Sequence, residues 1–230
     1  MSLQRVRREG VGVSKPVAVV ARYDAVLFDL LTALLDSRSL WNAVAGGAEA
    51  GARWRGEYLQ LTFGAGAYRP YGDLVAAAAR NQGLDPALAD QLVARWDELR
   101  PWPEAPWVLA ELARVNKVGV VTNCSEPLGR RAAARVGVRL DVVVTAEAAG
   151  AYKPRPEPYR AALDRLGYAP GRVLFVAGSR FDLPGARHVG MPMWWHNRTH
   201  MQRGDLPAPI AEHDTLTPLV SHCLATARQE

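Results

Sequence analysis

The chain has 230 residues, of which 49% are hydrophobic and 22% are charged, and its formal net charge is +5. This composition excludes a disordered or fibrous protein and is sufficient for a substantial hydrophobic core. Five basic residues and one acidic residue in the first 22 positions account for four of the net charges. Because the remainder is nearly neutral, we expect no nucleic-acid partner.

The N-terminal residues and the cysteine content indicate the compartment. Residues 1–21 combine charge with glycines and lack a sustained apolar period, so we expect a basic flexible tail there. No stretch reaches transmembrane length or has the core of a signal peptide, so we expect no membrane partner. The only cysteines, Cys124 and Cys223, support neither a disulfide framework nor a cysteine metal site. The expected location is cytoplasmic.

The first buried strand is predicted at residues 25–28, where an apolar run ends at Asp29. Residues 39–100 are then predicted to be helical, with breaks at 64–66, Pro70 and Gly83 and a last helix over 86–99. The second strand does not begin until about residue 117. The sequence therefore predicts a helical insertion after the first strand.

Strands and helices alternate from residue 104 onward. Strands are predicted at 117–121, 140–144, 172–176 and 193–196, and helices at 104–115, 127–136, 156–166 and 183–189. This alternation is typical of a parallel sheet with right-handed crossovers. We therefore predict an α/β fold: a doubly wound, Rossmann-like parallel-sheet core of residues 22–36 and 104–230, and an all-helical cap of residues 37–103.

Polar side chains follow the predicted strands. Asp29 follows the first strand, Thr122 and Asn123 follow the second, and Asp182 comes after the strand at 172–176. Lys153, in a chain with few lysines, stands in a Lys-Pro turn. Because the carboxyl ends of parallel strands share one edge of a sheet, we expect these side chains to converge there.

This set of residues resembles the haloacid dehalogenase superfamily, and within it the (S)-2-haloacid dehalogenase branch, over about residues 23–200. The resemblance includes spacing, since Lys153 and Tyr159 lie six residues apart and the apolar pair at 175–176 leads to Asp182. Trp54 and Arg55 match the position of the substrate arginine of that branch.

The resemblance implies that Asp29 displaces halide from a small anionic substrate and forms an ester, which water then opens. Lys153 would keep Asp29 ionised, Asp182 would activate the water, and Thr122 with adjacent amides would hold carboxyl oxygens. It further implies a homodimer formed through the cap. The implied substrate-binding residues are Arg55, Asn123, Tyr159, Ser179 and Leu31.

Two departures from the superfamily argue against phosphate chemistry. Phosphatases carry a proton-donating acid where this chain has Leu31, and leucine cannot transfer a proton. They carry a metal-binding aspartate where this chain has Gly178, and the loss of one carboxylate severely weakens a Mg²⁺ site. We therefore expect no metal and no cofactor.

Other departures affect the dehalogenase pattern itself. Thr32 and Ala33 stand in place of the family's Gly-Thr, and we expect this change to remove a hydroxyl that steadies Asp29. Ala177 and Ser179 stand where the branch has Ser and Asn. The sequence thus favours a metal-independent 2-haloacid dehalogenase type of hydrolase, with a phosphatase and a catalytically impaired binding protein as alternatives.

Overall fold

The computed structural model describes residues 19–226. Strand β1 (Val19–Ala21) pairs antiparallel with β8 (Leu224–Thr226), near the other end of the chain. The sequence prediction placed residues 19–21 in the tail, and this part of it is wrong, because their strand partner lies too far away in the sequence to leave a local pattern. The rest of the predicted tail lies outside the described residues.

The main sheet has six parallel strands in the order β4-β3-β2-β5-β6-β7. The predicted first strand is confirmed as β2, in the centre of the sheet, where Ala25 is aligned with both Lys117 and Val173. All four residues of β2 are buried, as expected for a strand covered on both faces. The strand bounds are Ala25–Phe28 (β2), Lys117–Thr122 (β3), Val142–Thr145 (β4), Val173–Ala177 (β5), Met193–His196 (β6) and Ala211–His213 (β7).

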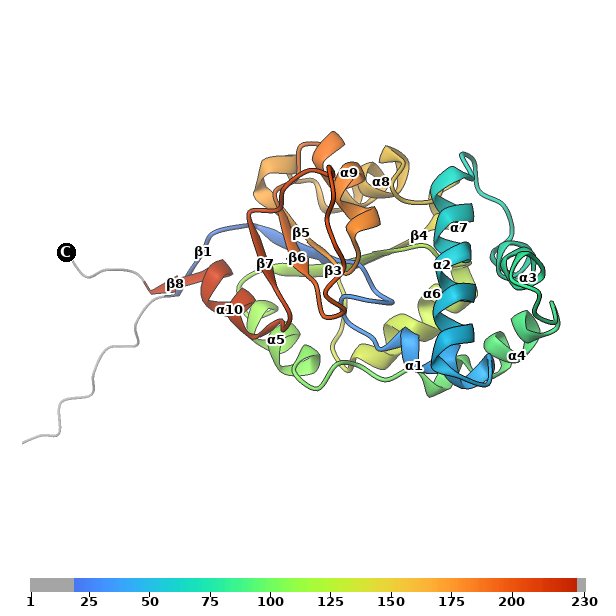
Figure 1. The fold of residues 1–230 in the computed structure, drawn as a ribbon. Helices are drawn as coiled ribbons and strands as arrows, with labels where there is room; N and C mark the ends of the chain where they lie inside the picture. Colours follow the sequence, from blue (N-terminus) through green and yellow to red (C-terminus); the bar gives the residue numbers. More distant parts are fainter. Residues whose placement is uncertain (1–18, 227–230) are drawn as a thin grey trace, which may run out of the picture.

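Helices cover both faces of the sheet (Figure 1). Val26 and Phe28 belong to one hydrophobic cluster, shared with α5 (Ala105–Leu112), α6 (Glu126–Ala133) and α10 (Thr217–Cys223). Ala25 and Leu27 belong to the other cluster, shared with α8 (Pro156–Leu166) and α9 (Leu183–His188). This alternation along β2 confirms the doubly wound α/β fold.

The chain between β2 and β3 is helical, as predicted. It forms α1 (Ser37–Val44), α2 (Ala48–Gly64), α3 (Tyr71–Asn81) and α4 (Leu88–Ala94), followed by the short 3₁₀ helix η1 (Trp96–Glu98). Buried aromatic rings hold these helices together: the rings of Trp41 and Trp54 lie 4.5 Å apart, and Trp54 Nε1 donates to Val75 O at 2.9 Å. The hydroxyl of Tyr58 on α2 donates to Asn123 O at 2.8 Å, so the inserted helices contact the tip of β3.

Several short elements lack a sequence signal and were not predicted. They are α7 (Ala146–Ala149), η3 (Pro170–Arg172), η4 (Arg180–Asp182), and β7, α10 and β8 near the C-terminus. The helix predicted at 127–136 is present as α6 followed by the 3₁₀ helix η2 (Ala134–Val136). Among the described residues, none of the helices has both the length and the apolar character that a membrane span requires.

Candidate active site

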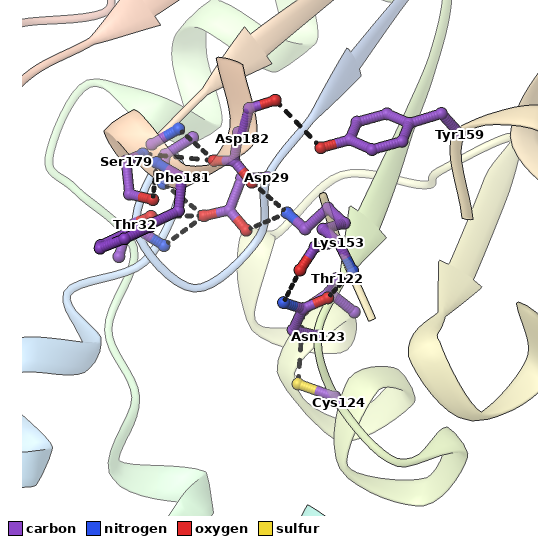
Figure 2. A network of polar contacts seen from close by, with 12 residues as sticks. Asp29, Thr32, Thr122, Asn123, Cys124, Lys153, Tyr159, Ser179, Phe181 and Asp182 are labelled. Atoms are coloured by element: carbon purple, nitrogen blue, oxygen red, sulfur yellow. Dashed lines mark hydrogen bonds and ion pairs between the residues drawn. The ribbon is translucent and has the colours of Figure 1, made fainter. Parts of the chain in front are cut away.

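Asp29 lies at the tip of β2, where the chain leaves the sheet in a tight turn. Its carboxylate is buried, and Oδ2 accepts three hydrogen bonds: from Thr32 N at 2.8 Å, from Thr32 Oγ1 at 2.5 Å and from Ala33 N at 3.2 Å (Figure 2). The turn is closed by the amides of Leu34 and Leu35, which both donate to Leu30 O. One carboxylate oxygen is thus held by the turn, while Oδ1 is left for other partners.

Lys153 bridges two carboxylates. Its Nζ lies 2.7 Å from Asp29 Oδ1 and 2.9 Å from Asp182 Oδ1, and all three side chains are buried. The backbone of Lys153 is fixed by the side chain of Asn123, which accepts from Lys153 N at 2.8 Å and donates to Lys153 O at 3.2 Å. Asn123 directly follows β3, so the neighbouring strand tip positions the lysine.

Asp182 is held from the opposite side. Its Oδ2 accepts hydrogen bonds from Gly178 N and Ser179 N, both at 3.2 Å, just after β5. Ser179 also caps the 3₁₀ helix η4, because its Oγ accepts from Phe181 N at 3.2 Å. The backbone carbonyl of Asp182 accepts the hydroxyl of Tyr159 at 3.1 Å.

These contacts shift the pKa values of the two carboxylates in opposite directions. Burial alone would raise the pKa of Asp29, but the Lys153 ammonium and the hydrogen bonds from Thr32 outweigh burial and hold that pKa below its ordinary value. Burial raises the pKa of Asp182, and Lys153 offsets this only in part because the Asp29 carboxylate repels a second negative charge. Two carboxylates raise the pKa of Lys153 despite its burial. Asp29 is therefore an ionised carboxylate, and Asp182 is the more basic one.

A cavity lies above Asp29, between the strand tips and helix α2. Arg55 of α2 lines it, and no side chain among the described residues is bonded to the Arg55 guanidinium. Burial lowers the pKa of Arg55, and the Asp29 carboxylate acts in the opposite direction. The predicted site residues that line this cavity are Asp29, Leu31, Arg55, Asn123, Lys153, Ser179 and Asp182.

Two predicted site residues, Thr122 and Tyr159, do not line this cavity. Thr122 is fully buried, and its hydroxyl lies 3.3 Å from Cys124 Sγ, where burial raises the pKa of that thiol to about 12. Tyr159 lies behind Asp182, with its ring against Phe175 at a centroid distance of 5.1 Å. Both side chains support the residues of the site from inside the core.

The hydroxyl that the sequence analysis counted as lost is present. Ala33 has none, but the hydroxyl of Thr32, one position earlier, donates to Asp29 Oδ2. Gly178 makes this close approach possible: a Cβ atom there would lie 2.2 Å from Thr32 Oγ1 and 2.3 Å from Ala33 N. The expectation that Asp29 lacks a steadying hydroxyl is therefore wrong, because the turn places the side chain of Thr32, and not that of residue 33, against the Asp29 carboxylate.

Two residues that the sequence analysis missed hold this turn from outside. Trp102 Nε1 donates to Thr32 O at 3.0 Å, and His196 Nδ1 lies 2.9 Å from Ala33 O. Arg198 covers the Trp102 ring at 4.5 Å from its centroid. Trp102 and His196 come from distant parts of the chain, so no local pattern could identify them.

A doubly wound parallel sheet with a buried Asp–Lys–Asp cluster at its carboxyl edge is the framework of an α/β-fold enzyme with a carboxylate nucleophile. Residues 23–190 match the model of the haloacid dehalogenase-like hydrolase family. The match covers most of the chain, and the chain belongs to this family.

Relatives with two kinds of named activity are similar to this chain. The (S)-2-haloacid dehalogenase of Xanthobacter autotrophicus is 30% identical over 187 residues, which cover 72% of each chain. The phosphoglycolate phosphatase of Xylella fastidiosa strain 9a5c is 31% identical over 190 residues, covering 76% of this chain and 82% of the phosphatase. A crystal structure of a dehalogenase with an intermediate complex superposes with a TM-score of 0.76 at 26% identity, covering 89% of this chain and 98% of that one.

Proposed function

We propose that this chain is a hydrolase of the 2-haloacid dehalogenase type. It displaces the leaving group of a small 2-substituted carboxylic acid through an Asp29 ester, and it does so without a metal. The observation that carries the proposal is the Lys153 ammonium between two buried carboxylates, 2.7 Å from Asp29 and 2.9 Å from Asp182. This arrangement supplies an ionised nucleophile and a separate base within one cluster.

In the first step, Asp29 Oδ1 attacks the carbon that bears the halogen. A C–O bond forms, the carbon–halogen bond breaks, and the halide leaves with the bonding electron pair, so the configuration at this carbon is inverted. Arg55 and Asn123 line the cavity and receive the departing anion, which needs hydrogen-bond donors and no proton. The backbone amides that follow Thr122 are the proposed donors to the substrate carboxylate.

In the second step, water opens the ester at the carbonyl carbon of Asp29. Asp182, whose pKa burial raises, accepts a proton from this water. Negative charge then develops on Oδ2, which already accepts the three hydrogen bonds from Thr32 and Ala33. The intermediate collapses and releases the 2-hydroxy acid, which takes up the proton, and the free Asp29 carboxylate is restored.

The phosphatase alternative meets a steric obstacle. An aspartate at position 178 would place its Cβ only 2.2 Å from Thr32 Oγ1 and 2.3 Å from Ala33 N, which is closer than these atoms can approach. Leu31, two residues after Asp29, has no proton to give to a leaving alcohol. The alternative of an impaired binding protein rests on Ala33 and Ala177, and it loses the first of these two arguments because Thr32 supplies the hydroxyl that Ala33 lacks.

The proposed function is tested by halide release from (S)-2-chloropropionate in the presence of a chelator, with the Asp29→Asn variant in parallel. We expect halide release that the chelator leaves unchanged and that the variant abolishes. Phosphate release from phosphate esters that requires Mg²⁺, together with no halide release, would instead support the phosphatase. Inactivity in both assays would support the binding protein.

We propose a cytoplasmic homodimer that pairs through the inserted helices, which would form a cap domain of residues 37–103. Light scattering on the purified chain tests the dimer, and substitutions of exposed α2 residues such as Phe63 test the surface through which it pairs.

A further inference from the structure

A second cavity adjoins the one above Asp29. The two share part of their walls, and the shared residues are Leu31, Thr32, Ser37, Arg55 and Ser179. The charged residues that line the second cavity are Arg38, Arg55 and Arg198, and no acidic residue of the described chain lines it. A substrate held above Asp29 therefore has an adjoining space whose charged lining residues are all basic.

Ser37 places an unused polar group in this shared wall. It is the first residue of α1, the residue is 1% exposed, and its Oγ has no hydrogen-bond partner within the described residues. A buried hydroxyl without a partner is unfavourable, so such a group in a cavity wall indicates a ligand that completes its bonding. Ser37 is not among the seven predicted site residues that line the cavity above Asp29.

Arg38 and Arg55 supply the charge. Neither guanidinium has a carboxylate partner within the described residues, and Arg38 is close enough to Arg55 to help lower the pKa of Arg55. Asp36 is adjacent in sequence, but its carboxylate caps α1 by accepting bonds from Ser39, and it does not line the cavity.

Arg198 contributes less charge to this wall. It is paired with Glu104 at 2.5 Å and lies over the ring of Trp102, so its charge is already balanced. Two arginines that form no ion pair within the described residues, beside one unpaired hydroxyl, favour an anion with hydrogen-bond acceptors.

We propose that the substrate is a dicarboxylic 2-halo acid, whose second carboxylate lies in the adjoining cavity and is bound by Ser37 and Arg38. Arg55 lines both cavities. This inference rests on the proposed function, because it takes Asp29 as the reacting group.

The test compares two acids of equal chain length, (S)-2-chlorosuccinate and (S)-2-chlorobutyrate, which differ in a terminal carboxylate. We expect kcat/KM to be at least about tenfold higher for chlorosuccinate. The ratio between the two acids should fall toward one in Ser37→Ala and in Arg38→Gln. It should be kept in the matched control Arg53→Gln, since Arg53 pairs with Glu49 and lines neither cavity.

A wild-type ratio near one would overturn the inference, and so would variants that lower kcat/KM for both acids alike. Calorimetry with the corresponding products, (R)-malate and (R)-2-hydroxybutyrate, tests the same subsite without any turnover. Tighter binding of malate that is lost in Arg38→Gln, with no halide released from either acid, would support the subsite and overturn the proposed function. Halide release together with equal binding of the two products would support the proposed function and overturn the subsite.

Discussion

The hydroxyl of Thr32 is expected to matter most when the Asp29 ester is opened. Thr32→Val keeps the shape of the side chain and removes one of three donors to Asp29 Oδ2, the one at 2.5 Å, while the amides at 2.8 and 3.2 Å remain. The loss of one donor to a developing oxyanion slows catalysis by about 10²–10³-fold. Because two donors remain, we predict a loss of about 10²-fold, which corresponds to about 2.7 kcal/mol in the barrier.

The assay separates the two steps. Rapid-quench halide release follows the formation of the ester, and intact mass follows its hydrolysis. In Thr32→Val we expect a burst of halide and an adduct that accumulates on Asp29, whereas Thr32→Ser should keep most of the wild-type rate. Circular dichroism and thermal unfolding control for the fold. A Thr32→Val enzyme that hydrolyses the ester within threefold of the wild-type rate, and without accumulated adduct, would refute this account of the turn.

Three further predictions follow from the same contacts. Lys153→Met leaves two buried carboxylates facing one another without their shared partner, so thermal or urea unfolding should show a loss of about 3–5 kcal/mol; a variant as stable as wild type would contradict this. The rate of ester hydrolysis should fall as pH drops through the raised pKa of Asp182, because protonation removes the base; a single-turnover pH profile that stays flat down to about pH 4 would argue against Asp182. Trp102→Phe removes the bond to Thr32 O, worth about 1 kcal/mol, and should lower kcat by about fivefold, whereas the half-exposed Trp107→Phe control should leave kcat unchanged.

The core of the fold and the central cluster could be predicted because their causes are local or topological. The strand predicted at residues 25–28 has the same first and last residue as β2, since a strand covered on both faces needs an unbroken apolar segment. Asp29 and Asp182 converge because parallel strands end at one edge, and Lys153 joins them from a loop that Asn123 fixes.

The remaining features depend on contacts between distant segments. Strand β1 exists because it pairs with β8, and nothing within residues 19–21 indicates that partner. The role of Thr32 follows from the path of the turn, which requires the missing Cβ of Gly178 and the donors Trp102 and His196. The sequence identified both Thr32 and Gly178 as departures, but only the structure places them in contact.

The ester mechanism is tested most directly by a single turnover in H₂¹⁸O, with enzyme in excess over (S)-2-chloropropionate. Because water attacks the carbonyl carbon of Asp29, the product should carry oxygen from the protein, and mass spectrometry should find the ¹⁸O in the peptide that contains Asp29. Product that carries ¹⁸O after one turnover, with an unlabelled Asp29 peptide, would mean that water attacks the substrate directly and would contradict the account.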